Sequence, residues 1–191
     1  GNNAVILGNV GWDLNIATTE YINGVFMELW KAPGQERYTA YEIAKMEDSL
    51  YFYDKYLQEP RIIAIAPWRV SKMGNSALIP RDAEENIRYA KLFAAMVMVI
   101  PENGYILYSD NNWDENDGDY GHQYYDFYNI DLGKATSKVI EVTKGVAFKK
   151  HQDGYIAFNR LGYDVTVDFG DFQSVIPPMS GVFLNLDGKK I

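Results

Sequence analysis

The sequence has no cysteine among its 191 residues. This absence excludes disulfide bonds, thiolate-bound zinc and a cysteine nucleophile. Histidine is scarce as well, because His122 and His151 are the only two and lie far apart in the chain. A Ser-His-Asp triad or a histidine-rich zinc site therefore has little support. The segment 8–11 lacks the third glycine of a dinucleotide-binding fingerprint, so we expect neither a metal nor a cofactor.

Positive charge is in the minority, since 18 Lys and Arg face 26 Asp and Glu and the net charge is −8. Nucleic acid is an unfavourable partner for such a chain, because neutralising phosphates takes clustered basic residues. An anionic membrane surface is unfavourable for the same reason. The apolar segment 92–100, which Pro101 ends, is shorter than the ~20 residues of a membrane span, so we expect none. The cellular location stays open, with a secreted or periplasmic protein as one alternative.

Aromatic residues, by contrast, are abundant: they make up 15% of the chain and include 15 tyrosines and 4 tryptophans. Four apolar runs each end in polar and aromatic residues, at 4–13, 23–30, 61–69 and 104–112. We predict a strand in each run. In parallel α/β folds, ligands and chemistry gather at the carboxyl ends of the strands. Carboxylates beside flat aromatic rings are suited to a carbohydrate site.

Two helices are predicted between these runs. Thr39 and Glu42 have the spacing of a capping box, and an apolar stripe continues from Ile43 to Leu57 at spacings of three and four. A second helix is predicted to start near Asp82. The resulting order of β, β, α, β, α, β favours parallel strands joined by crossover helices.

The pattern changes after residue 113. Short strands separated by turn residues are predicted at 146–149, 154–159, 165–169 and 181–186. Their alternation of apolar and polar residues is typical of an antiparallel sheet with one solvated side. We therefore predict two domains, an α/β domain over residues 1–120 and an antiparallel β-domain over residues 121–191.

Several short motifs resemble glycoside-hydrolase-like families in which a (β/α)8 barrel precedes a small antiparallel β-domain. The motifs lie at 22–28, at 124–126 with 131–134, and at 154–159, 165–168 and 180–184. The resemblance implies a partial (β/α)8 TIM-type barrel, namely its C-terminal half, followed by a small antiparallel β-sandwich-like domain. Because only four barrel-like strands are predicted, we expect a homo-oligomer or a missing N-terminal half to complete the barrel.

Cleavage of a glycosidic bond needs two carboxyl groups, ~5 Å apart for retention and ~6.5–9.5 Å apart for inversion of the anomeric centre. Glu28 and Asp110 each end an apolar strand, and we predict that they form the catalytic pair. An apolar setting would favour the protonated form of Glu28 that a general acid needs. The structural alternatives are a strand-end salt bridge for Glu28 and a loop cap for Asp110.

The other strand-end residues are predicted to bind the substrate, with core packing or a plain ion pair as the alternative for each. They are Trp12, Asp13, Trp30, Trp68, Arg69 and Trp113. The acidic loop 110–119 departs from a calcium-binding EF-hand, because Glu115 stands where glycine is needed. We therefore predict a glycoside hydrolase acting on an unidentified carbohydrate. The alternative is a carbohydrate-binding or structural module without catalysis.

Overall fold

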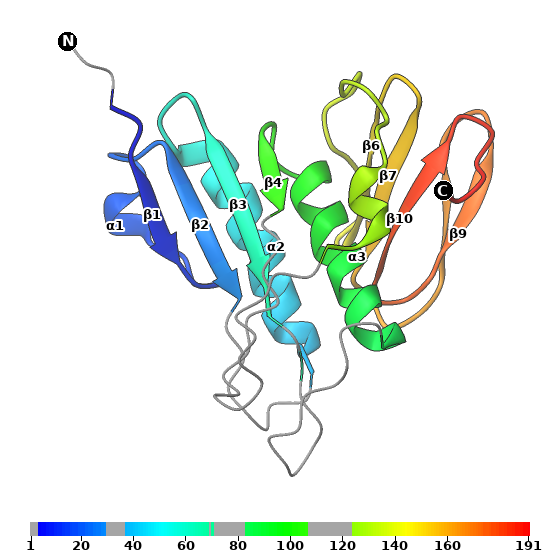
Figure 1. The fold of residues 1–191 in the computed structure, drawn as a ribbon, viewed down its shortest axis with the longest axis horizontal. Coiled ribbons are helices and arrows are strands. Elements are labelled where there is room, and N and C mark those ends of the chain that lie inside the picture. Colours follow the sequence, from blue (N-terminus) through cyan, green and yellow to red (C-terminus); the bar gives the residue numbers. More distant parts are fainter. Residues whose placement is uncertain (1–3, 30–36, 69, 71–82, 107–123) are drawn as a thin grey trace.

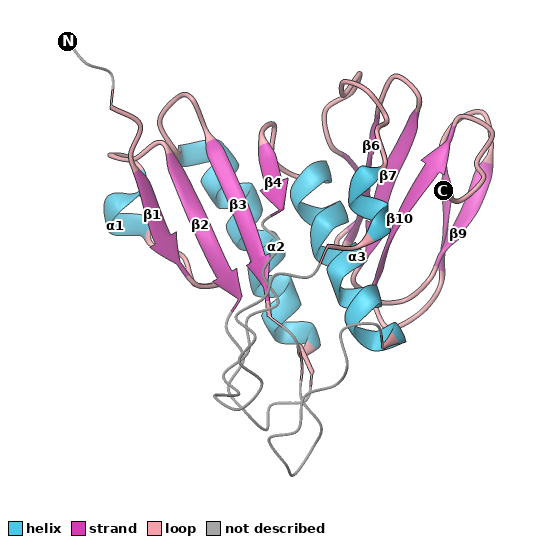
Figure 2. Ribbon diagram, in the orientation of Figure 1, coloured by secondary structure: helices cyan, strands magenta, loops and turns pink. Residues whose placement is uncertain are grey.

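The computed structural model of the chain describes residues 4–29, 37–68, 70, 83–106 and 124–191. The N-terminal strands lie at one side of the molecule and the C-terminal strands at the other (Figure 1). Figure 2 shows that one long helix lies behind the first set of strands and another lies between the two sets.

The N-terminal part forms a parallel sheet with the order β1-β2-β3-β4. Its strands are β1 (Leu7–Val10), β2 (Gly24–Leu29), β3 (Ile62–Pro67) and β4 (Gly104–Ile106). The connections between them contain α1 (Ile16–Thr19), α2 (Ala40–Tyr56) and α3 (Glu84–Val99). The predicted order of strands and helices is therefore confirmed, with the single turn of α1 added between the first two strands.

α2 begins at the predicted capping box. Thr39 Oγ1 accepts a hydrogen bond from the Glu42 backbone N–H at 3.2 Å, and Glu42 Oε2 accepts one from the Thr39 N–H at 2.6 Å. These bonds satisfy backbone donors that have no partner within the helix. The predicted apolar stripe from Ile43 to Leu57 is buried, so α2 is anchored at its start and packed along one side.

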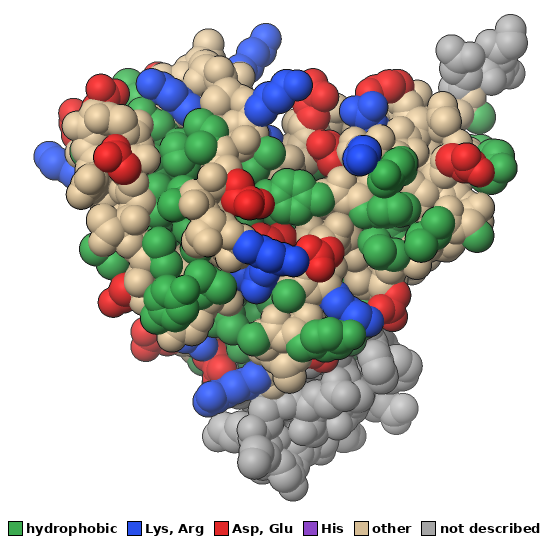
Figure 3. Space-filling view, turned by 180° about the vertical axis from the view of Figure 1, so that it is seen from behind, with side chains coloured by type: hydrophobic (Ala, Val, Ile, Leu, Met, Phe, Trp, Pro, Cys, Tyr) green, Lys and Arg blue, Asp and Glu red, His purple; other side chains and the backbone are tan. Residues whose placement is uncertain are grey.

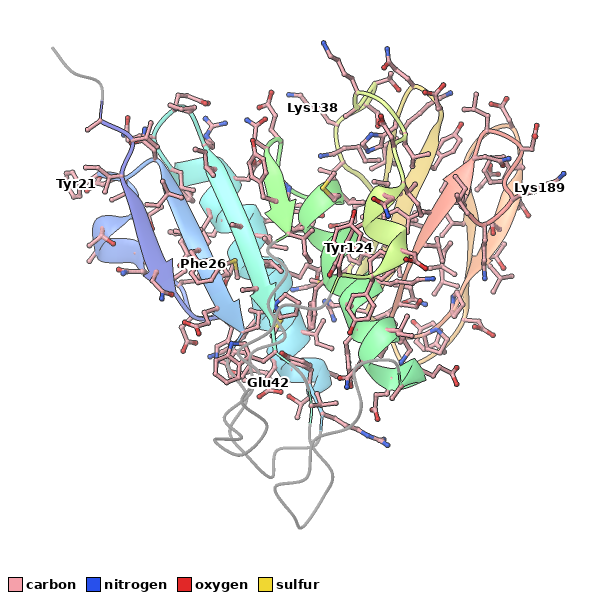
Figure 4. All side chains as sticks on the ribbon, viewed as in Figure 1. Tyr21, Phe26, Glu42, Tyr124, Lys138 and Lys189 are labelled. Atoms are coloured by element: carbon pink, nitrogen blue, oxygen red, sulfur yellow. The ribbon has the colours of Figure 1, made fainter. Side chains whose placement is uncertain are left out.

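The parallel sheet has one face that packs on helices and one that does not. Along β2, Val25, Met27 and Leu29 are fully buried, whereas Phe26 and Glu28 between them are partly exposed. Successive side chains of a strand point to opposite sides, so Phe26 and Glu28 project away from the helices. We call this second side of the sheet the open face, and Phe26 is labelled on it in Figure 4. It is exposed only in part, since Ala64 and Ala66 of β3 on the same side are buried.

The C-terminal part forms two antiparallel sheets. The larger has the order β10-β7-β6-β5 and consists of β5 (Ile140–Thr143), β6 (Val146–Lys150), β7 (Gly154–Asn159) and β10 (Ser180–Asn185). The smaller pairs β8 (Val165–Asp168) with β9 (Gln173–Ile176), and a 3₁₀ turn, η1 (Asp126–Asn129), precedes both sheets in the chain. The four antiparallel strands predicted beyond residue 145 are thus confirmed.

α3 joins the two parts into one core, because it packs on β3 and β4 as well as on β7 and β10. The approach is closest at Gly181 of β10, where a Cβ would lie 2.1 Å from the Lys91 carbonyl oxygen and 2.6 Å from the Ala95 Cβ. Residues of both parts, such as Met27 and Phe183, belong to one hydrophobic cluster. The core therefore runs across the predicted domain boundary.

The predicted fold class, a partial (β/α)8 TIM-type barrel followed by a small antiparallel β-sandwich-like domain, is wrong. The described residues form three α-helices, one four-stranded parallel sheet and antiparallel sheets of four and two strands, which is a mixed α/β fold with few helices. The helices of a barrel form an outer ring, whereas α3 is covered by a second sheet. Because the fold is not a barrel, there is no longer a reason to expect a second copy or an N-terminal half that completes one.

Candidate functional site

Glu28 lies near the carboxyl end of β2 and projects from the open face. The side-chain amide of Asn9, on the neighbouring β1, donates a hydrogen bond to Glu28 Oε2 at 3.3 Å. Among the described residues, no lysine or arginine forms an ion pair with Glu28. Among the described residues, the Glu28 carboxylate therefore contacts an amide and takes part in no salt bridge.

One row of side chains crosses the open face beside Glu28. Asn9, Phe26, Ala64 and Tyr105 are paired in register across the four strands, and side chains paired in this way project to the same side of a sheet. Tyr105 is 51% exposed, and Phe26 is partly exposed. Together with Glu28, the row places two aromatic rings, one amide and one carboxylate on a single face.

Tyr38 fastens the carboxyl ends of β2 and β3 together. Its buried hydroxyl lies 2.9 Å from the carbonyl oxygens of Leu29 and Trp68, and it accepts a hydrogen bond from the Trp68 N–H at 3.0 Å. Burial raises the pKa of Tyr38 far above its ordinary value, so the hydroxyl keeps the proton that it donates. The strand ends next to Glu28 are therefore held in place from the interior.

Trp12 and Asp13 are held by the helix side of the sheet. The Trp12 carbonyl oxygen accepts a hydrogen bond from the Ser49 hydroxyl of α2 at 2.9 Å. The Asp13 carboxylate forms an ion pair with Lys45 of α2 at 2.8 Å, and this hydrogen bond raises the pKa of Lys45. Because α2 covers the face opposite to the open face, the structure brings Trp12 and Asp13 together but not with Glu28.

A pocket of about 300 Å³ lies beside these two residues. Its lining consists of Trp12, Asp13, Leu14, Lys45, Asp48 and Ser49. The charged groups in it are already engaged, Lys45 with Asp13 and Asp48 with Lys144 at 3.6 Å. We therefore regard this pocket as a weaker candidate for chemistry than the open face.

Four predicted site residues, Trp30, Arg69, Asp110 and Trp113, lie outside the described residues. The separation of the Glu28 and Asp110 carboxyl groups is therefore untested, and their pairing stays a prediction. Trp68 is described and is only 8% exposed, so little of its ring can be reached from solvent. Its contact with a sugar also stays a prediction.

Metal-ligating side chains do not gather in the part of the chain that the structure describes: no group of three or more His, Asp or Glu is placed there to hold an ion. No described helix combines the length and the apolar character needed to cross a membrane. Seen from behind, Lys and Arg side chains are interspersed with Asp and Glu among the coloured residues (Figure 3). Over the coloured residues, that face therefore carries no large patch of one charge.

Asn9, Phe26 and Tyr105 were not among the residues that the sequence pattern singled out. The position of Phe26 could have been predicted from the sequence, because it precedes Glu28 by two residues and every second side chain of a strand projects to the same side. Asn9 and Tyr105 carry none, since their places beside Phe26 follow from the register between strands.

Comparison with known proteins gave no match, either to a protein-family model or to a curated protein sequence. We therefore infer the function from the geometry of the described residues. The features that bear on it are the Glu28 carboxylate, the Asn9 amide and the rings of Phe26 and Tyr105, all on the open face.

Proposed function

We propose that this protein hydrolyses glycosidic bonds of a carbohydrate bound on the open face, with Glu28 as one of the two reacting carboxyl groups. The observation that carries the proposal is the position of Glu28. It is a carboxylate near the carboxyl end of a parallel strand, and its partner is an amide instead of a cation. Such a group is available to transfer a proton or to attack an anomeric carbon.

Asn9 gives the Glu28 side chain a defined orientation. Its amide holds Oε2 at 3.3 Å, so Oε1 is left as the atom that faces a substrate. In the proposed mechanism Asp110, which follows β4 in the sequence, supplies the second carboxyl group. A separation of ~5 Å between the two would give retention and one of ~6.5–9.5 Å would give inversion.

Phe26 and Tyr105 supply the contact surface for sugar rings in this proposal. Their register with Asn9 places both rings on the face that carries Glu28. The apolar side of a sugar ring packs on an aromatic face, while the hydroxyl groups of the sugar bond to nearby amides and carboxylates. The mixture of groups on the open face favours a neutral sugar over a strongly anionic one, because Glu28 repels negative charge.

The test is the substitution Glu28→Gln, assayed against a panel of polysaccharides and chromogenic glycosides. Loss of the ionisable group should lower kcat/KM by about 10²–10⁴-fold. Circular dichroism and a melting curve should be unchanged, since Glu28 makes one long hydrogen bond and no described ion pair. Glu84→Gln, at an exposed position in the first turn of α3, is the matched control. Unchanged turnover in a folded Glu28→Gln variant would remove Glu28 from the mechanism.

The second candidate is a carbohydrate-binding module without catalysis. It is favoured by one observation: in the described part of the row and its surroundings on the open face, Glu28 is the single carboxylate. Under this alternative the wild-type protein binds an oligosaccharide in a calorimetric titration but releases no reducing ends. Release of reducing ends that is lost in Glu28→Gln excludes it.

A further inference from the structure

A second polar site lies at the opposite end of the parallel sheet, between the start of β4 and the end of β6. Two adjoining pockets of about 300 and 230 Å³ share Glu102, Ala135 and Lys149 in their linings. Lys138 also lines the larger pocket, and Figure 4 shows it near the top of the molecule, between β4 and the C-terminal strands. The strand ends that carry Glu28 lie at the other end of the sheet.

Lys149 is a charged side chain with unused bonding capacity in this site. It is 4% exposed, and its Nζ donates one hydrogen bond to the Pro101 carbonyl oxygen at 2.7 Å. An ammonium group carries three donors, and no other acceptor for them is found among the described residues. Burial lowers the pKa of Lys149, and the carboxylates of Asp54 and Glu102 oppose this effect. The geometry leaves two donors beside the pockets.

His151 adds a second unused group. It follows Lys149 by two residues in extended backbone, so both side chains project to the same side. Its Nδ1 lies 3.0 Å from the Gly133 carbonyl oxygen, and because a carbonyl can only accept, Nδ1 carries the proton. Nε2 of the neutral ring is then an acceptor, and within the described residues it is buried without a hydrogen-bond partner. His151 itself is 6% exposed and lines the smaller pocket.

A single hydroxyl group can be the missing hydrogen-bond partner of both side chains, because it accepts from the Lys149 ammonium and donates to the His151 imidazole nitrogen. The surroundings favour a neutral ligand over an anionic one. The larger pocket is lined by Asp54 and Glu102 as well as by Arg61, Lys138 and Lys149, so charges of both signs face it and an anion would meet carboxylates beside the cations. The carboxylates of Asp54 and Glu102 and the amide of Asn103 can form hydrogen bonds with further hydroxyl groups of a ligand. The volumes lie at or below the small end of known ligand sites, ~300–1,000 Å³.

We propose that this pocket binds a small neutral polyhydroxylated molecule, such as a free monosaccharide, with one hydroxyl between Lys149 Nζ and His151 Nε2. His151 Nε2 is buried in the described structure, so the side chains around it must shift to admit that hydroxyl. The smaller pocket meets the open face at Tyr105, which belongs to its lining, but the proposal does not rest on hydrolysis at Glu28.

The test is a titration of the wild-type protein with glucose, galactose or mannose, followed by NMR of the histidine ring signals. The chain has only two histidines, so His122→Gln assigns the signals. We expect at least one of these sugars to shift the His151 signal at millimolar concentration, whereas inorganic phosphate and acetate should not. A signal that no sugar moves, or that phosphate alone moves, overturns the proposal.

Lys149→Met sharpens the test, since it should weaken sugar binding at least about tenfold by removing the charged donor. Lys189→Met, at an exposed position far from the pocket (Figure 4), is the control and should bind as the wild type does. Binding that is unaltered in a folded Lys149→Met variant contradicts the proposed contact. Glu28→Gln should leave the His151 shift intact, so failure at this pocket and failure at the open face give different results.

Discussion

The two main sheets of this protein are packed in different ways. Three strands of the antiparallel sheet, β6, β7 and β10, are covered on both sides, with Phe158 and Phe183 in the cluster around α3 and Phe148 and Leu184 in the cluster with β8 and β9. The parallel sheet packs on helices with one side. On its other side Phe26 and Glu28 of β2 are partly exposed, whereas Ala64 and Ala66 of β3 are buried. A sheet enclosed on both sides has little surface for a ligand, so its contribution is structural.

The difference predicts two kinds of response to mutation. Substitutions at the interface between α2, α3 and the antiparallel strands should lower the free energy of unfolding. Substitutions on the open face should change ligand turnover and leave that free energy nearly unchanged. The following variants test this division, in order of decreasing expected effect on stability.

The largest effect is expected at the ion pair between Glu47 of α2 and Arg160 after β7. Both residues are buried, with exposures of 2% and 9%, and the Arg160 guanidinium bonds to the Glu47 carboxylate. Arg160→Met leaves a buried carboxylate without its partner and should lower the free energy of unfolding by about 3–5 kcal/mol. Urea denaturation at pH 7 measures it. A loss below about 1 kcal/mol would show that this interface is not a structural anchor.

The same variant should respond to pH. Burial raises the pKa of the Glu47 carboxyl, and Arg160 opposes that rise. Without Arg160 the folded-state pKa lies further above the unfolded-state value, so the folded protein binds the extra proton first as the pH falls. The stability deficit of Arg160→Met should therefore shrink as the pH is lowered from 7 toward the unfolded pKa of Glu. A deficit that is constant with pH would contradict this account of Glu47.

Gly181 tests how tightly β10 lies on α3. A methyl group there would meet the Lys91 carbonyl oxygen at 2.1 Å, and backbone cannot yield as a side-chain tip does. Gly181→Ala should cost about 1–3 kcal/mol, the usual range for overpacking. The control is Gly162→Ala, where a Cβ would meet nothing within 4 Å and the change should stay within about 0.5 kcal/mol. Equal effects of the two substitutions in thermal unfolding would contradict the close approach.

Asn9→Ala tests the open face, in contrast to the preceding substitutions in the interior. Asn9 is exposed and orients Glu28 through one hydrogen bond, so the free energy of unfolding should change by less than about 0.5 kcal/mol. Turnover of a cleaved glycoside should fall about tenfold, because a hydrogen bond to a charged group is lost. Leu7→Ala is the control, two residues earlier on the same strand, and should leave turnover unchanged. A large loss of stability in Asn9→Ala with normal turnover would place the residue in the scaffold instead.

Local features of the sequence predicted local features of the fold. The Thr39–Glu42 capping box and the stripe from Ile43 to Leu57 were predictable, because each depends on residues three or four positions apart. The barrel was wrongly predicted, since closure depends on what covers α3. One signal was present: α3 is apolar around most of its circumference, with Leu92, Phe93 and the residues to Val97 buried, as is typical of a helix covered on more than one side.

The site was predictable only in part, for a related reason. Glu28 could be identified from the end of its own strand, but its neighbour Asn9 lies 19 positions away in the sequence. The pairing of Asp13 with Lys45, 32 positions apart, likewise has no local signature. Contacts between distant segments follow from strand register and helix placement, which composition and spacing do not encode.

The most direct test of the central claim is a crystal structure of the Glu28→Gln variant with a bound oligosaccharide. The account predicts sugar rings against Phe26 and Tyr105 on the open face, with a glycosidic oxygen within hydrogen-bonding distance of the side chain at position 28. An oligosaccharide bound only in the pocket beside Trp12 and Asp13, or only on the antiparallel sheets, would contradict the assignment of function to the open face.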